Sequence, residues 1–268
     1  HADLLHRFTL AELPKQAPQA MLPKQEVYLE KVSFTYPKAQ SPALQRINIR
    51  LPMGSCVGLV GGTGAGKTTL VDIILGLLPP SEGKLLVDGT PITKDNLRSW
   101  QQALGYVAQD IFISDATVAE NIALGVPPEY IDSKAVQDCA RMAQVHDFIT
   151  EHLPRGYDTE VGEGGIRLSG GQRQRIGIAR ALYQNPAMLI FDEATSALDH
   201  LTEQAVMKSI YNLAQAKSIV LIAHRLSTVK GCDCIYVLEE GQVVGSGTYE
   251  ELALYNSQFQ ELTQGIGD

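Results

Sequence analysis

Residues 61–68 combine glycines with a lysine and a hydroxyl in a spacing that suits phosphate binding. They read Gly-Gly-Thr-Gly-Ala-Gly-Lys-Thr and match the pattern Gly-x-x-x-x-Gly-Lys-Ser/Thr between a predicted strand and a predicted helix. Glycines let backbone N–H groups crowd around phosphate oxygens, and the N-terminus of the following helix adds a favourable dipole. We therefore expect Lys67 to reach the terminal phosphates of a nucleotide and Thr68 to offer its hydroxyl to Mg²⁺. A glycine-rich turn without a ligand is the alternative interpretation.

Two carboxylates, Asp192 and Glu193, follow an apolar stretch over residues 188–191 that predicts a buried strand. Ligands of open α/β sheets bind beyond the carboxyl ends of the parallel strands. We expect Asp192 to hold the magnesium shell and Glu193 to take a proton from, or orient, the attacking water in phosphoryl transfer. Acidic residues after a strand are usually solvated, so this prediction depends on the glycine loop in the same chain.

A third motif, Leu-Ser-Gly-Gly-Gln over residues 168–172, precedes a predicted helix and provides a second anion site at a helix N-terminus. With the other two motifs, it makes the chain resemble the nucleotide-binding domains of ABC proteins over about residues 26–265. The resemblance implies a head-to-tail dimer, in which the glycine loop of one subunit and this signature motif of the other enclose each ATP. A flexible Ser-Gly loop that only caps a helix is the alternative interpretation.

The resemblance also implies roles for single residues. Tyr36 resembles the aromatic residue that stacks on adenine, although it also suits a core position at a strand end. Gln109 resembles the glutamine that contacts Mg²⁺ and the attacking water, and His224 resembles the histidine that contacts the γ-phosphate. Residues 196–199, which end at Asp199, resemble the loop that crosses the dimer interface. This segment also suits a helix N-cap.

These roles make the expected protein an ATPase with ATP and Mg²⁺ as cofactors. The expected catalytic residues are Glu193, His224, Gln109 and Lys67. The expected ATP-binding residues are Tyr36, Gly61, Gly62, Thr63, Gly64, Ala65, Gly66, Lys67, Thr68, Thr69 and Gln109. The residues expected to reach ATP across the dimer are Ser169, Gly170, Gly171, Gln172 and Asp199, and those expected at the metal are Thr68, Gln109 and Asp192.

Segments beside these motifs resemble ABC exporters rather than importers. Residues 159–163, Thr-Glu-Val-Gly-Glu, resemble the stretch that exporters place against the intracellular loops of their membrane domain. Residues 109–113 and 117–122 also resemble exporters, whereas Gly164 stands where arginine is frequent in them. The resemblance implies two partners: a transmembrane domain of the same transporter and a second ABC ATPase domain, in a homodimer or a heterodimer.

Other ATPase classes fit the sequence less well. The formal net charge is −8, with 22 basic against 30 acidic side chains, which disfavours nucleic acid as a partner. A DNA-repair or chromosome-maintenance ATPase would separate its phosphate motifs by a long coiled coil, and a translation-associated ABC protein would carry two such domains and a basic linker. A regulatory ATP-binding module without turnover would be favoured by loss of Glu193 or His224, and both are present.

The elements that must position these residues alternate between strand and helix patterns. Strands are predicted over residues 27–36, 47–51, 56–60, 84–87, 105–108, 188–191, 218–223 and 234–238, with a hairpin turn at 239–241. A helix is predicted over 68–77, and residues 111–184 are mostly helical in pattern. The expected fold class is α/β, a P-loop NTPase with a RecA-type core and a mainly parallel sheet, an antiparallel β subdomain and an inserted α-helical subdomain.

The expected domain organisation places a proline-containing linker from a missing transmembrane domain at residues 1–25 and an ABC ATPase domain at 26–265. Within that domain, about 26–108 and 187–250 form the catalytic core with the β subdomain, and about 110–185 form the helical subdomain. The longest apolar runs are strand-sized, so we expect a soluble fragment. Its parent would be an integral membrane protein that holds it at the cytoplasmic face of a bacterial inner membrane. The four scattered cysteines are expected to be reduced.

Overall fold

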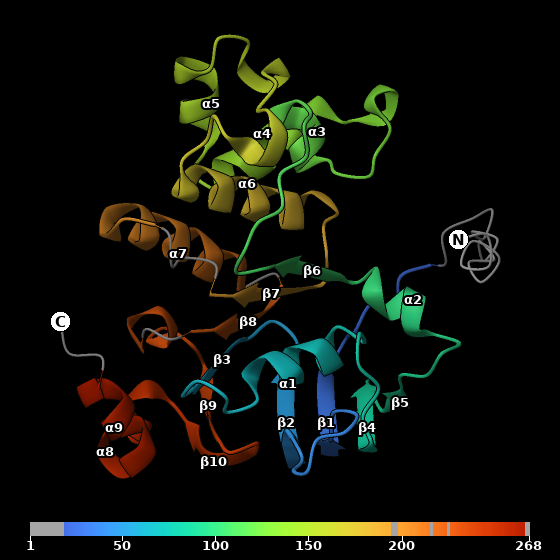
Figure 1. Ribbon diagram of the computed structural model, residues 1–268, viewed down its shortest axis with the longest axis vertical. Coiled ribbons are helices and arrows are strands. Elements are labelled where there is room, and N and C mark those ends of the chain that lie inside the picture. Colours follow the sequence, from blue (N-terminus) through green and yellow to red (C-terminus); the bar gives the residue numbers. More distant parts are fainter. Residues whose placement is uncertain (1–18, 194–197, 215–216, 224–225, 266–268) are drawn as a thin grey trace.

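A six-stranded, mainly parallel sheet forms the centre of the computed structural model, which describes residues 19–193, 198–214, 217–223 and 226–265 (Figure 1). The strand order is β10-β9-β3-β8-β7-β6, and all neighbours are parallel except β9 and β10. The strands are β3 (Cys56–Gly61), β6 (Leu104–Val107), β7 (Met188–Asp192), β8 (Ser218–Ile222), β9 (Cys234–Glu239) and β10 (Gln242–Gly247). The predicted turn between β9 and β10 is confirmed, with positive φ of 46° at Glu240 and 76° at Gly241, as tight hairpins favour.

The central sheet separates two apolar cores. Successive side chains of a strand point to opposite faces, so Val57 and Leu59 of β3 pack in one core and Cys56 and Val60 in the other. Strands β3, β7 and β8 are buried along their whole length because both faces are covered. This arrangement explains why their sequences are continuous apolar runs.

An antiparallel sheet covers one of these cores, as the sequence predicted. Its order is β2-β1-β4-β5, and its strands are β1 (Glu26–Phe34), β2 (Leu44–Pro52), β4 (Glu82–Val87) and β5 (Thr90–Pro91). Helices α1 (Lys67–Ile74) and α2 (Leu97–Gln101) belong to the same core, where the buried Trp100 donates its indole N–H to Ile74 O at 2.7 Å. Helix α1 ends before the predicted residue 77, because the chain turns at Gly76 with φ of 68°.

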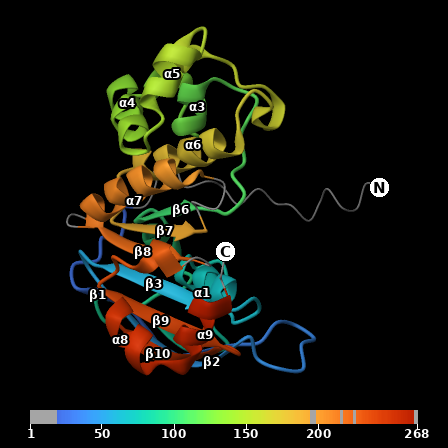
Figure 2. The same cartoon turned by 90° about the vertical axis from the view of Figure 1, so that its left-hand side faces the viewer.

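Helices α3 to α6 gather at the opposite end of the molecule, beyond the central sheet (Figures 1 and 2). They are α3 (Val118–Ile122), α4 (Ser133–Met142), α5 (His146–His152) and α6 (Gly170–Tyr183), with 3₁₀ turns at Pro128–Tyr130, Gly156–Asp158 and Glu163–Gly165. Helix α7 (His200–Ala214) lies between them and the sheet (Figure 2). The predicted α/β fold class, with its inserted helical region, is confirmed.

The remaining described residues contain elements that the sequence patterns did not predict. These are α7, the 3₁₀ turn Leu226–Val229, α8 (Tyr249–Tyr255) and α9 (Ser257–Gly265), besides α2 and β5. Residues 19–25, at the end of the predicted linker, contact the domain: Met21 N donates to Ser99 O at 2.7 Å, and Lys24 N to Asp88 Oδ2 at 2.7 Å. Residues 1–18 lie outside the described part of the chain. Among the described helices, none has both the length and the apolar character needed to cross a membrane.

Candidate nucleotide site

The glycine loop joins β3 to α1 and folds around its own lysine. Gly66 has φ of 99°, and a Cβ there would lie 2.8 Å from Ala43 O, so glycine is needed both for conformation and for space. The Lys67 ammonium donates to Gly61 O at 2.7 Å and to Gly62 O at 3.0 Å, and the residue is only 7% exposed. Burial lowers the pKa of Lys67, and the negative charges of Glu193 and Asp192 partly oppose this. The loop therefore holds a buried cation beside two carboxylates.

The carboxyl ends of β6, β7 and β8 bring the predicted catalytic carboxylate beside Gln109. Gln109 Nε2 donates to Glu193 Oε2 at 3.1 Å, although the two residues are 84 positions apart. Glu193 has φ of 50°, and its backbone N–H donates to Ile222 O at 3.0 Å. The buried side chain of Gln174, from α6, donates to Glu193 O at 3.3 Å. Hydrogen bonds with β8 and α6 thus hold the Glu193 backbone at a positive φ that is unfavourable for glutamate, and Gln109 orients its carboxylate.

A pocket of about 460 Å³, here called the loop pocket, collects many of the predicted residues in one place. Tyr36 is 42% exposed at its edge, with its hydroxyl 3.0 Å from Thr69 Oγ1 and its ring packed edge-on against Phe34. Such a ring offers an apolar face to a planar base. The lining residues are Tyr36, Ala43, Thr63, Gly64, Ala65, Gly66, Lys67, Thr68, Thr69, Gln109, Glu193 and Ile222. The pocket can accept an aromatic group at one side and phosphates at the glycine loop.

The second phosphate motif lies elsewhere in the same chain. Ser169 caps α6: its hydroxyl accepts from Gln172 N at 3.2 Å, and Gln172 Oε1 accepts from Ser169 N at 2.8 Å. Among the described residues, those that line the loop pocket include none from this motif. The second predicted phosphate motif is thus separate from the loop pocket in the part of the chain that the structure describes.

Asp199 precedes α7 and is exposed, with its carboxylate accepting from Thr202 N at 3.1 Å. Hydrogen bonds from Thr202 lower the pKa of Asp199. This geometry agrees with the helix-cap interpretation and leaves the carboxylate at the surface. Ser196 and Ala197, from the same predicted segment as Asp199, lie outside the described part of the chain, and so does His224.

Tyr106 contacts the site, and the sequence analysis did not predict it. Its hydroxyl donates to Asp192 Oδ2 at 3.1 Å. Burial and the negative charge of Asp192 raise the pKa of Tyr106, so the hydroxyl stays protonated at neutral pH. The residue precedes Gln109 by three positions on a predicted strand, which was the available signal. Its partner could not be inferred without the pairing of β6 with β7.

The donor set fits Mg²⁺. This ion prefers oxygen ligands and is usually held by one or two carboxylates, with waters and substrate phosphates completing the shell. Thr68 and Gln109 line the loop pocket and offer a hydroxyl and an amide oxygen, while Asp192 is 8% exposed at the end of β7. No group of three or more His, Cys, Asp or Glu side chains in the described residues forms a complete metal cage. Thr68, Gln109 and Asp192 offer oxygen donors of the kind that Mg²⁺ accepts together with substrate phosphates.

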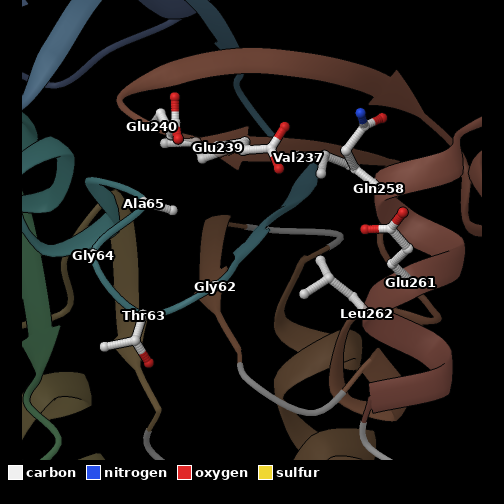
Figure 3. A pocket seen from close by; sticks show the side chains of 11 residues that line it. Gly62, Thr63, Gly64, Ala65, Val237, Glu239, Glu240, Gln258, Glu261 and Leu262 are labelled. Atoms are coloured by element: carbon white, nitrogen blue, oxygen red, sulfur yellow. The ribbon is translucent and has the colours of Figure 1, made fainter.

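A second pocket, here called the acidic pocket, lies beside the glycine loop (Figure 3). It has a volume of about 340 Å³ and is bounded by residues 62–65, the end of β9 and one face of α9. Glu239, Glu240 and Glu261 contribute three carboxylates to its lining. Phosphates would be repelled there, so the loop pocket, which contains Lys67, is the better nucleotide site.

Comparison with known proteins places these features in context. The model of a family described as "ABC transporter" matches residues 44–196. An ATP-dependent lipid A-core flippase of Saccharophagus degradans is 43% identical over 245 residues, which is 88% of this chain and 41% of the flippase. The ABC multidrug transporter MDR5 of Trichophyton rubrum is 40% identical over 237 residues, which is 88% of this chain and 18% of that transporter.

The fold is also similar to that of a solved structure. A bacterial Atm1-family ABC exporter with ATP bound superimposes with a TM-score of 0.89 and 35% sequence identity. The match covers 100% of this chain and 47% of that exporter. The chain thus spans less than half the length of each of these relatives.

Proposed function

The chain belongs to the ABC transporter family, and from this premise we propose that it is the ATP-binding and ATP-hydrolysing motor domain of an exporter. The observation that carries the proposal is the loop pocket, where the glycine loop with Lys67, the ring of Tyr36, and the Gln109–Glu193 pair line one space. Each of these groups supplies a different requirement of nucleotide hydrolysis. The similarity to a flippase, a multidrug transporter and an Atm1-family exporter supports export as the process that is driven.

In this proposal, backbone N–H groups of the loop and the Lys67 ammonium bind the phosphates, and Tyr36 stacks on the adenine. The ammonium exchanges its present contacts with Gly61 O and Gly62 O for phosphate oxygens, which carry more negative charge. Glu193 accepts a proton from the attacking water, and the Gln109 amide keeps the carboxylate oriented toward it. His224 contacts the γ-phosphate as an additional polar group.

Mg²⁺ is the proposed metal, held by Thr68, Gln109 and Asp192. When bound, it would neutralise charge that develops on the phosphate oxygens during transfer. The protein's own contribution is to present three oxygen ligands from different elements at one end of the sheet. Thr68 is the second residue of α1, Asp192 ends β7, and Gln109 follows β6.

The proposed active assembly is a head-to-tail dimer of two such domains. In it, residues 169–172 of one copy close over the nucleotide in the loop pocket of the other, with Asp199 beside the interface. The separation of the two phosphate-binding ends within one chain supports this arrangement. The transmembrane domain of the same transporter is the second proposed partner, contacted through Gln109 and the segment around Glu160. In this proposal, the domain lies at the cytoplasmic face of a membrane.

The decisive experiment measures Mg²⁺-dependent phosphate release by the wild type and by Glu193→Gln, with dimer formation in ATP followed by size-exclusion chromatography. Loss of the base should lower turnover by about 10²- to 10⁴-fold while nucleotide binding is retained, so the variant accumulates as an ATP-bound dimer. Glu240→Gln is the matched control, because this glutamate lines the acidic pocket instead of the loop pocket. Binding without turnover in the wild type would favour a regulatory ATP-binding module. Normal turnover in Glu193→Gln would contradict the assignment of the base.

A further inference from the structure

We propose that Tyr106 is a positioning residue that fixes the Asp192 carboxylate in the orientation needed to receive Mg²⁺ with ATP. The inference rests on the proposed function, because it assumes that Asp192 is a metal ligand. It adds to the site a residue from a strand that contributes no other side chain to the proposed metal shell. Its basis is the hydrogen bond of 3.1 Å from the Tyr106 hydroxyl to Asp192 Oδ2.

The pairing of β6 with β7 puts Tyr106 within reach of Asp192. The two strands are parallel, and Tyr106 lies opposite Ile190 in the register. Asp192 follows Ile190 by two positions, so both point to the same face of β7, the face that packs in the core with α1. The tyrosine side chain therefore reaches diagonally along this face toward the carboxyl end of the sheet. Thr68, in the first turn of α1, lines the loop pocket together with Glu193 and Ile222, which lie at that end of the sheet.

The surroundings of Tyr106 indicate that its hydroxyl, more than its ring, matters to the site. β6 is the edge strand of the sheet, and Tyr106 is 40% exposed there, so the ring buries only part of its apolar area. Phenylalanine would pack in this position about as well. The hydroxyl instead points at a carboxylate that is 8% exposed and occupies one of its two oxygens. This contact restricts rotation of the carboxylate and so fixes the direction in which it faces the proposed metal.

Orientation of this kind matters for Mg²⁺ because the ion demands near-ideal octahedral geometry. Partners that orient a metal ligand are typically worth about 10- to 100-fold in metal affinity or activity. Tyr106→Phe removes the hydroxyl while it keeps the ring. The variant should therefore retain the fold and the glycine loop, and lose only the metal-dependent part of nucleotide binding.

The test measures the dissociation constant of a fluorescent ATP analogue for the full 268-residue chain, once in EDTA and once in excess Mg²⁺. The ratio of the two constants reports the contribution of the metal, and it is compared among the wild type, Tyr106→Phe and Tyr157→Phe. Tyr157 is the matched control, because its hydroxyl also has a polar partner, His146 Nδ1 at 2.8 Å, and does not line the loop pocket. Melting temperatures of all three proteins are recorded in EDTA.

In EDTA, we expect the dissociation constant of Tyr106→Phe for the analogue to lie within about twofold of the wild-type value. The increase in affinity on addition of Mg²⁺ should be up to about tenfold smaller in Tyr106→Phe than in the wild type. Tyr157→Phe should match the wild type in both buffers. An unchanged gain in Tyr106→Phe would overturn the inference and leave the proposed function intact. Equal weakening in both buffers would also overturn it, since a general structural defect acts without the metal. A wild type that binds no nucleotide in either buffer would overturn the proposed function itself.

Discussion

Replacement of Lys67 by methionine should separate the nucleotide contribution of this side chain from its contribution to stability. The ammonium is buried and donates to two loop carbonyls, so the substitution loses two hydrogen bonds and also removes the desolvation that lowers the pKa of the lysine. These two effects on stability oppose each other, so we expect the free energy of unfolding of the ligand-free variant to differ from that of the wild type by only about 1 kcal/mol. Loss of charge-assisted contacts to the phosphates, at about 1.5–3 kcal/mol each, should weaken ATP binding by about 100-fold.

Thermal unfolding with and without Mg²⁺-ATP provides the assay. At an ATP concentration about 100 times the dissociation constant, binding stabilises the wild type by about 2.7 kcal/mol. At about 2–4 °C per kcal/mol, this raises the melting temperature by roughly 5–10 °C. The same ATP concentration should raise the melting temperature of Lys67→Met by only about 1 °C, because this variant binds ATP about 100-fold more weakly. Lys217→Met is the matched control, because Lys217 also donates to two oxygens, those of Asn185 and Pro186, but away from the loop. A full ATP-induced shift in Lys67→Met would refute the placement of the phosphates at this ammonium.

Three further predictions concern the scaffold of the site. Burial opposes the charge of Asp88, but backbone N–H groups of residues 24–26 outweigh this and lower its pKa, so its contribution is present above about pH 4 and is lost as the pH falls further. Asp88→Asn should therefore cost about 1 kcal/mol at pH 7 and flatten the acid limb of a stability-against-pH curve measured with urea. Gly105→Ala should destabilise by about 1–3 kcal/mol in thermal unfolding, since its Cβ would lie 2.7 Å from Ala181 O; wild-type stability would contradict the close packing of β6. Glu193→Gly should be more stable than Glu193→Ala by about 1 kcal/mol and unfold at a higher temperature, because glycine accepts the positive φ of 50° at this position. Equal unfolding temperatures of the two variants would show that the backbone of residue 193 is not strained.

Local motifs predicted the parts of the site that are continuous in sequence. The glycine loop, its flanking strand and helix, and the two carboxylates after β7 depend on short-range pattern, and the structure has these elements where the pattern put them. The contact between Gln109 and Glu193 depends instead on the pairing of β6 with β7. Spacing along the chain carries no information about such pairing. Only the resemblance to a known family brought these two residues into one predicted site.

The sequence patterns did not predict some helices, although one of these helices has a clear periodic pattern and another is too short to have one. Helix α7 buries Val206, Met207 and Ile210, a spacing that indicates one apolar face of a helix. Helix α2 has five residues, too few for a periodic pattern to stand out, and tertiary contacts such as that of Trp100 with Ile74 hold it. Tyr106 resembles any half-exposed tyrosine of an edge strand until its partner is known. The difference lies in whether the stabilising contact is local or comes from a distant segment.

The backbone of Glu193 shows why the chemistry of this site depends on the whole fold. A glutamate after a buried strand would ordinarily continue in an extended conformation, and holding it at a φ of 50° costs about 1–3 kcal/mol. The conformation persists because β8 accepts its N–H through Ile222 O and α6 donates to its carbonyl through Gln174. Gln174 lies two positions beyond the motif that caps the start of α6. The orientation of the predicted base is therefore fixed partly by the same helix whose N-terminus is predicted to contact the nucleotide of a second copy. In the proposed dimer, this one helix would contact the base of its own nucleotide site through Gln174 and the nucleotide of the second copy through its N-terminus.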